Sequence, residues 1–144
     1  MSKSVAIIAT VIGCFGLLDS GYLTVKHLQG SYIRCGDECS AVLGSRYADG
    51  VGGVPLAGFG AMAYLAVIIG GLAAAWGSPT GRRVLSIMGP VMGLISLWLL
   101  YLQAFVIHAF CKYCLASAAA SLLLAGLVLM EWLARRARNT RGIT

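Results

Sequence analysis

The sequence predicts an all-α membrane protein, a four-transmembrane-helix bundle in which residues 1–144 form a single domain. Hydrophobic residues make up 59% of the 144 positions and charged residues only 11%, whereas charged residues are about 25% of a soluble domain. The mean hydropathy is +0.85. A membrane-spanning helix needs about 20 apolar residues. Four runs of that length occur, at residues 5–25, 56–76, 84–107 and 114–133.

The first run follows Lys3, and we predict a retained span there rather than a cleaved signal peptide. A signal peptide has an apolar region of about 7–15 residues before a cleavage site with small residues. Here the run extends to Asp19, Ser20 and Gly21 and then resumes as Tyr22–Val25. We therefore count it as the first helix of the bundle.

The later runs define the loops. Residues 29–54 form the only sizeable loop, because the connections at 76–84 and 108–113 are too short to be more than turns. The third run contains Gly89 and Gly93 in a G-x-x-x-G spacing, which lets helices approach closely. We expect this spacing to serve packing within the bundle, and dimerisation and a ligand crevice are the alternatives.

The basic residues predict the orientation in the membrane. With four spans both termini lie on one side, and that side collects 7 of the 11 Lys and Arg residues, against 4 on the other. Positive residues accumulate on the cytoplasmic side, so we expect cytoplasmic termini in a cell (inner) membrane. The net charge of +6 then reflects an Arg-rich tail against anionic lipid headgroups, and no nucleic-acid partner is expected. The seven are Lys3, Arg82, Arg83, Arg135, Arg136, Arg138 and Arg141, and the four are Lys26, Arg34, Arg46 and Lys112.

Cysteines carry the candidate chemistry. Cys111 and Cys114 lie three positions apart at the start of the last apolar run, so they share one face of a helix and can close a small disulfide ring. Unpaired amides, the helix dipole and Lys112 are expected to stabilise a thiolate there. A thiol of low pKa is a good leaving group in disulfide exchange. The pair also lies at the membrane surface, within reach of a lipid-soluble oxidant.

A second pair, Cys35 and Cys39, lies in the polar loop beside Gly36 and two acids. An even number of crossings separates the two pairs, so both are expected at the outer face of the membrane, where disulfides persist. We interpret the loop pair as a mobile shuttle between Cys111 and an external protein. One alternative is two static disulfides that hold the loop on the bundle, and another is a tetrahedral zinc site made of the two cysteine pairs.

Together these residues resemble the vitamin K epoxide reductase family. The resemblance covers about residues 19–133 and includes the order of the two cysteine pairs. It also includes the pattern C-S-x-V-x-x-S-R-Y at residues 39–47 and the Val-Pro-Leu sequence at residues 54–56. The bacterial quinone-linked membrane proteins that form disulfides also combine a C-x-x-C with a shuttle pair, but their C-x-x-C precedes the shuttle pair in the sequence. The cysteine order therefore favours the vitamin K epoxide reductase family.

The resemblance implies a quinone-dependent protein-thiol oxidoreductase that supports disulfide-bond formation. An extracytoplasmic thioredoxin-fold (DsbA-like) partner would be oxidised at Cys35. Cys39 would pass the electrons to Cys111, and Cys114 would reduce a quinone bound inside the bundle. The stretch after Cys39 would form a half-helix lid over the site, between helices 1 and 2.

The resemblance also implies the quinone contacts. Leu43 would form an apolar wall and Ser45 matches the family's loop serine, while Leu56, Phe59 and Ala118 would complete the site. Leu56 and Ala118 stand where the animal enzymes have an asparagine and a tyrosine that hydrogen-bond to the quinone oxygens. A respiratory quinone, ubiquinone or menaquinone, is therefore expected rather than vitamin K epoxide, and a vitamin K-like naphthoquinone is the alternative.

Three further residues have alternative interpretations. Asp19 is expected either to make a structural hydrogen bond or to act in the site, because a carboxylate is unfavourable at mid-bilayer. His108 is either solvated or relays protons to the quinone. Cys14 has no partner in sequence and is expected to be a buried, inert thiol. The competing class is a small four-span transporter with structural disulfides, in which Asp19 would bind cations.

Overall fold

The structure is a computed structural model that describes residues 1–30, 37–50, 52 and 54–141. Within this part of the chain, four helices are long and apolar enough to cross a membrane. The prediction of an all-α, four-span protein is thus confirmed. The four helices are α1 (Lys3–Leu28), α3 (Leu56–Ala75), α4 (Pro79–Tyr101) and α5 (Lys112–Arg141).

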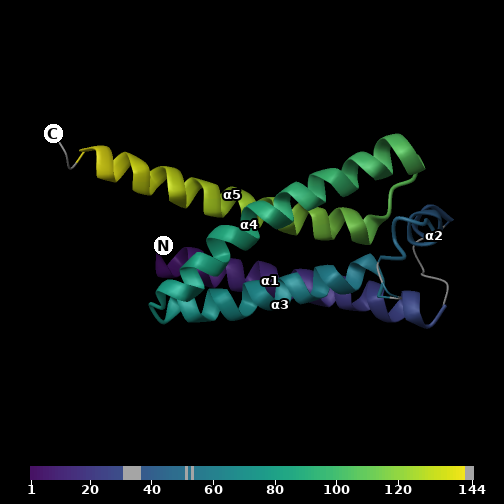
Figure 1. Cartoon of the computed structure of the whole chain (residues 1–144), viewed down its shortest axis with the longest axis horizontal. Coiled ribbons are helices and arrows are strands. Elements are labelled where there is room, and N and C mark those ends of the chain that lie inside the picture. Colours follow the sequence, from purple (N-terminus) through teal and green to yellow (C-terminus); the bar gives the residue numbers. More distant parts are fainter. Residues whose placement is uncertain (31–36, 51, 53, 142–144) are drawn as a thin grey trace.

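Two shorter elements lie at the end of the bundle opposite the chain termini. The helix α2 (Asp37–Leu43) occupies the predicted outer loop, and the π-helix η1 (Leu102–Ile107) continues α4. In Figure 1, α2 lies beside the connection from η1 to α5, whereas the N and C termini lie together at the other end. An even number of spans returns the chain to the same side, as expected.

Local sequence signals set the helix ends. The Ser2 hydroxyl accepts a hydrogen bond from the Val5 N–H (3.3 Å) and so caps the start of α1. The helix α4 begins at Pro79, a residue suited to the first helical position because its missing N–H would have no partner there. Both α4 and α5 extend beyond the predicted apolar runs. Hydropathy marks only the segment of a helix that suits the hydrocarbon core, and polar residues continue each helix past that segment.

The contact between α3 and α4 depends on a glycine. A Cβ atom at Gly81 of α4 would lie 2.5 Å from the backbone N of Ala74 and 2.6 Å from the carbonyl O of Gly70 in α3. Helices in lipid gain little from the hydrophobic effect and associate mainly through close van der Waals packing, which small residues permit. Glycine at this position therefore lets the two backbones touch.

The predicted G-x-x-x-G spacing lies between α4 and α5. A Cβ atom at Gly89 would meet the Val128 side chain at 2.9 Å, and one at Gly93 would meet Cβ of Ala125 at 2.7 Å. Both partners belong to α5. The spacing therefore serves packing within the bundle, as predicted.

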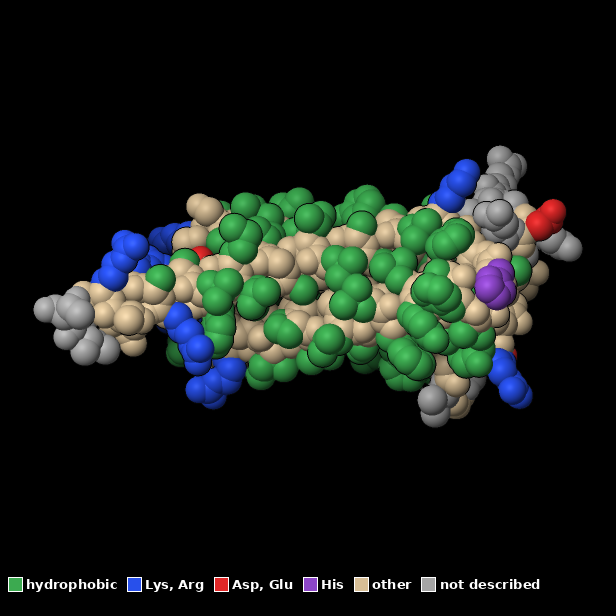
Figure 2. Space-filling model, turned by 90° about the horizontal axis from the view of Figure 1, so that it is seen from above, with side chains coloured by type: hydrophobic (Ala, Val, Ile, Leu, Met, Phe, Trp, Pro, Cys, Tyr) green, Lys and Arg blue, Asp and Glu red, His purple; other side chains and the backbone are tan. Residues whose placement is uncertain are grey.

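The surface separates an apolar middle from charged ends (Figure 2). Large apolar side chains are exposed on the membrane helices, among them Leu18, Met62 and Leu123. Such a belt suits lipid acyl chains rather than water. At the terminal end, the N-terminal amine of Met1 lies 3.4 Å from Glu131 Oε1, which ties the start of α1 to α5.

Gly81→Ala should lower the thermal stability of the protein, because its new methyl group would meet backbone atoms that cannot rotate away. Overpacking of this kind is destabilising by about 1–3 kcal/mol. Gly126→Ala is the matched control, since a Cβ atom there meets nothing within 4 Å and alanine favours the helix. Circular dichroism in detergent measures both unfolding midpoints, and equal midpoints for the two variants would contradict the packing.

Candidate active site

The C-x-x-C pair lies where α5 begins, as predicted. Cys111 directly precedes the first residue of α5 and Cys114 lies in its first turn. Both are free thiols. The backbone N–H of Cys114 donates a hydrogen bond to Cys111 Sγ (3.4 Å). The sulfur therefore satisfies one of the amides that a helix N-terminus leaves unpaired.

This environment favours the thiolate of Cys111. Hydrogen bonding from Cys114 lowers the pKa of the Cys111 thiol to about 7, although burial acts in the opposite direction. The side chain is 0% exposed and packs in a small apolar cluster with Val42 and Ala109. Cys111 is thus chemically activated but shielded from solvent.

The turn that leads into the pair is held by Gln103, a residue of η1. Its carbonyl O accepts a hydrogen bond from the Ala109 N–H (3.2 Å), and its side-chain Oε1 accepts one from the Cys111 N–H (3.3 Å). His108, which follows η1 and precedes Ala109, adopts the left-handed conformation, with φ 54°. Sequence reasoning missed Gln103, although an amide inside an apolar run is a signal that could have found it.

A cavity opens beside Cys114. Its enclosed volume is about 120 Å³, and it widens into an open mouth. Its wall is mostly apolar and draws on every helix, for example through Leu23 of α1, Leu99 of α4 and Ser117 of α5. The cavity could hold a flat apolar ring system against the Cys114 side chain.

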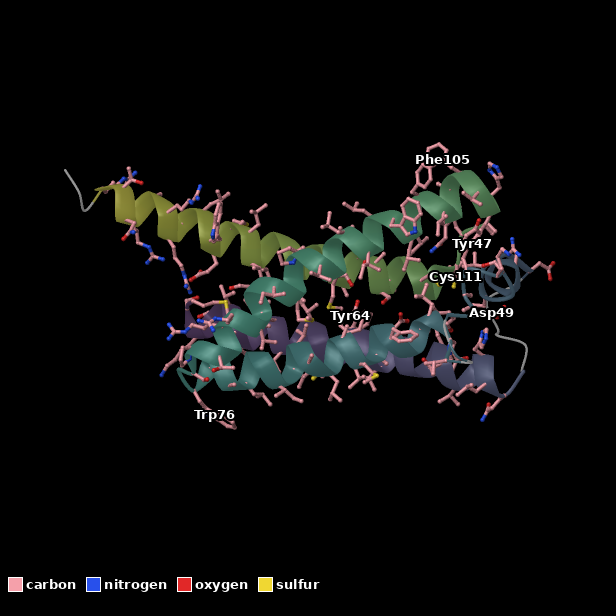
Figure 3. The ribbon with its side chains drawn as sticks, viewed as in Figure 1. Tyr47, Asp49, Tyr64, Trp76, Phe105 and Cys111 are labelled. Atoms are coloured by element: carbon pink, nitrogen blue, oxygen red, sulfur yellow. The ribbon has the colours of Figure 1, made fainter. Side chains whose placement is uncertain are left out.

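A hydrogen-bonded cluster around Tyr64 lies next to this cavity. The Tyr64 side chain is 1% exposed, and its hydroxyl donates to the Ser117 carbonyl O (2.7 Å) and pairs with Ser121 Oγ (2.7 Å). Ser117 Oγ in turn lies 3.5 Å from Ser20 Oγ. Figure 3 shows Tyr64 between the helices, farther from α2 than Cys111 is. The cluster joins α1, α3 and α5 at the cavity, because Ser20 and Ser117 belong to its wall.

The predicted lid corresponds to α2. Val42 of α2 packs against Cys111, and Leu43, the last residue of α2, lines the cavity. Cys39 belongs to α2, but its side chain and all of Cys35 lie outside the described residues. The helix α2 thus places a backbone segment of the loop that contains Cys39 directly over the C-x-x-C pair.

Three of the five predicted quinone contacts line the cavity, namely Leu43, Ser45 and Leu56. The Ser45 hydroxyl donates to the Val42 carbonyl O (2.7 Å), which holds the turn after α2. The other two do not belong to the wall. Phe59 is 46% exposed and Ala118 is buried.

Other polar residues lie outside this cavity. Asp19 lines a separate groove between α1 and α5 with Tyr22 and Lys112, and its Oδ2 atom is buried with no hydrogen-bond partner among the described residues. His108 is exposed. The prediction of a buried Cys14 is wrong, because this thiol is exposed on α1. The neighbouring Gly13 is the residue that faces α3.

One family model, described as the vitamin K epoxide reductase family, matches residues 7–129. The matched range contains both cysteine pairs and every residue of the cavity wall. A comparison with curated proteins gave no match.

A thiolate titration tests the environment of Cys111. In a protein with serine at positions 14, 35 and 39, absorbance near 240 nm should show one thiolate forming with a midpoint at about pH 7. Above this pH Cys111 is ionised, and below it the thiol is protonated. Replacing Cys114 by alanine in the same background removes its side-chain hydrogen bond, so the midpoint should move upward. An unchanged midpoint would show that Cys114 does not stabilise the thiolate.

Proposed function

Since the chain belongs to the vitamin K epoxide reductase family, we propose that it carries electrons from an extracytoplasmic protein thiol to a membrane quinone. Members of the family are membrane thiol-disulfide oxidoreductases that use quinones, and the chain shares this general activity. In the proposal, the loop pair Cys35/Cys39 accepts electrons from a thioredoxin-fold partner. The pair Cys111/Cys114 passes them to the quinone, and the reaction supports disulfide-bond formation.

The observation that carries this proposal is the different surroundings of the two thiols in the C-x-x-C pair. Cys114 lines the cavity, whereas Cys111 is buried against Val42 of the lid. In such a relay one thiol must face the electron donor and the other the acceptor. In the proposal Cys111, which is buried against Val42, exchanges with the loop pair, and a quinone in the cavity meets Cys114.

The proposed relay balances in electrons and protons. The partner's thiolate attacks Cys35 of the loop disulfide, and the partner becomes oxidised as the loop becomes a dithiol. Cys39 then attacks Cys111 of the Cys111–Cys114 disulfide and releases Cys114 as a thiolate, and Cys35 resolves the mixed disulfide. The resulting dithiol gives two electrons and two protons to the quinone, which leaves as the quinol.

The proposed acceptor is a respiratory quinone, ubiquinone or menaquinone, with a vitamin K-like naphthoquinone as the alternative. The cavity wall supplies Leu43, Ser45 and Leu56 as contacts for its ring. Phe59 and Ala118 are not in the wall, so the proposal now gives them no direct contact with the ring.

The proposed location is the cell inner membrane, with both termini in the cytoplasm and the cysteines outside. The support is the gathering of Lys3, Arg82, Arg83 and the tail arginines on the terminal side of the chain. The Arg136 guanidinium lies over the Trp132 ring in a cation–π contact, 4.2 Å from its centroid, which suits an interfacial aromatic residue beside lipid headgroups.

Cys111→Ser and Cys114→Ser are each expected to abolish quinone reduction driven by dithiothreitol, because the relay needs both thiols. The loss of quinone absorbance measures turnover in purified protein. Cys14→Ser is the matched control, since this thiol is exposed on α1 and should be dispensable. Turnover within a few-fold of wild type in either C-x-x-C variant would contradict the oxidoreductase and favour the four-span transporter.

The order of the relay is tested by trapping. In the Cys35→Ser/Cys114→Ser variant neither pair retains a resolving thiol, so a Cys39–Cys111 disulfide should accumulate when a mild oxidant such as oxidised glutathione accepts the two electrons. Peptide mass mapping without reduction detects this bond, which should also protect the loop from proteolysis. The control is Cys39→Ser/Cys114→Ser. A Cys35–Cys111 bond there, with no Cys39–Cys111 bond in the first variant, would reverse the proposed order.

A further inference from the structure

The cavity beside Cys114 contains few hydrogen-bond donors that are free to meet a ligand. The Ser45 hydroxyl donates to the Val42 carbonyl, and Ser117 is occupied by the Tyr64 cluster. His27 Nε2 lies 3.7 Å from Asp49 Oδ1. These side chains therefore offer few free hydrogen-bond donors to a quinone carbonyl in the cavity.

Two side-chain donors of this wall, the Tyr47 hydroxyl and the Gln103 amide NH₂ group, donate no hydrogen bond among the described residues. Tyr47 is 46% exposed and can donate to water, so Gln103 is the buried donor of the two. It lines the cavity and is 4% exposed, so its amide is almost removed from water. The Cys111 N–H can pair only with an oxygen acceptor, so Oε1 of the amide must face Cys111. The Nε2 group therefore points away from Cys111. Among the described residues, no hydrogen bond uses its two hydrogens.

The position of this amide is fixed from both sides. The Gln103 carbonyl accepts the Ala109 N–H (3.2 Å) and so closes the turn at His108. The side-chain oxygen is held by Cys111, the residue next to the first turn of α5. A donor that is already held in place loses little entropy when it binds a ligand.

We propose that Gln103 Nε2 donates a hydrogen bond to a carbonyl oxygen of the quinone bound beside Cys114. This inference rests on the proposed function. The ring oxygens gain negative charge as the quinone accepts electrons, so the hydrogen bond strengthens during the reaction. Gln103 itself transfers neither an electron nor a proton. Since one amide contacts both the quinone and Cys111, it also fixes the ring relative to the C-x-x-C pair.

The chain offers a direct test, because it contains only two glutamines, Gln29 and Gln103. Protein labelled with ¹⁵N in the glutamine side chains should give two NH₂ signals, which Gln29→Asn assigns. Short-tailed ubiquinone is added to the redox-inert Cys111→Ser/Cys114→Ser protein in detergent. The Gln103 signal should shift with saturation, and the signal of exposed Gln29 should stay unchanged.

A second measurement follows quinone affinity and the quinone carbonyl stretching band in the same background. Gln103→Leu removes the proposed donor and also the acceptor of the Cys111 N–H, so it should weaken quinone binding by at least about tenfold. It should also move the carbonyl band toward its value in free quinone. Ser96→Ala is the matched control, because Ser96 is another buried polar residue of the α4–η1 span but does not line the cavity. It should change neither quantity.

The outcomes separate this inference from the proposed function. Saturable quinone binding with no shift of the Gln103 signal would overturn the hydrogen bond and leave the oxidoreductase intact. Absence of quinone binding to the redox-inert protein, together with no quinone reduction by the unmodified protein, would overturn both. If Gln103→Leu fails to fold, the labelled parent protein still decides the question.

Discussion

The first amides of α5 have no helical carbonyl to accept their hydrogen bonds, and they lie at the edge of an apolar bundle. A buried N–H without a partner costs about 1–3 kcal/mol. Here the Cys111 sulfur accepts from Cys114 N–H, and the Gln103 amide accepts from Cys111 N–H. Because one acceptor is the reactive sulfur itself, the contact that caps the helix also stabilises the thiolate. The rest of the site is arranged around this cap.

The packing of the bundle explains why the cavity lies at the end near α2. Glycine contacts bring α4 against α3 at Gly81 and against α5 at Gly89 and Gly93. Beyond these contacts α4 runs away from α3 toward the α2 end (Figure 1), and the cavity lies between their diverging ends. The buried Tyr64 cluster then keeps α1, α3 and α5 together beside the open region. Tight packing and an open site can therefore coexist in one small bundle.

Hydropathy and cysteine order predicted the four spans and the helix start at the C-x-x-C pair, because both follow from local composition. Two positions that differ from expectation, Phe59 and Cys14, depend on rotation about a helix axis. Each residue turns a helix by about 100°, so Phe59 points well away from the direction of Gly60, which lines the cavity with Leu56. Cys14 faces outward for the same reason. The role of Gln103 depends on the π-helix and the turn after it, which apolar periodicity does not reveal.

The burial of Cys111 also bears on why such a site would use a shuttle on its own chain. A thiol that is 0% exposed cannot be attacked directly by the thiolate of a folded external protein. The segment packed on Cys111 is α2, and Cys39 precedes Val42 in that helix by less than one turn. In the proposed relay, a small displacement of α2 would exchange one covering residue for another, whereas direct attack by a partner protein would require the whole of α2 to leave Cys111. A relay of the proposed kind would thus let the chain's own loop pair, rather than the partner protein, exchange with the buried Cys111.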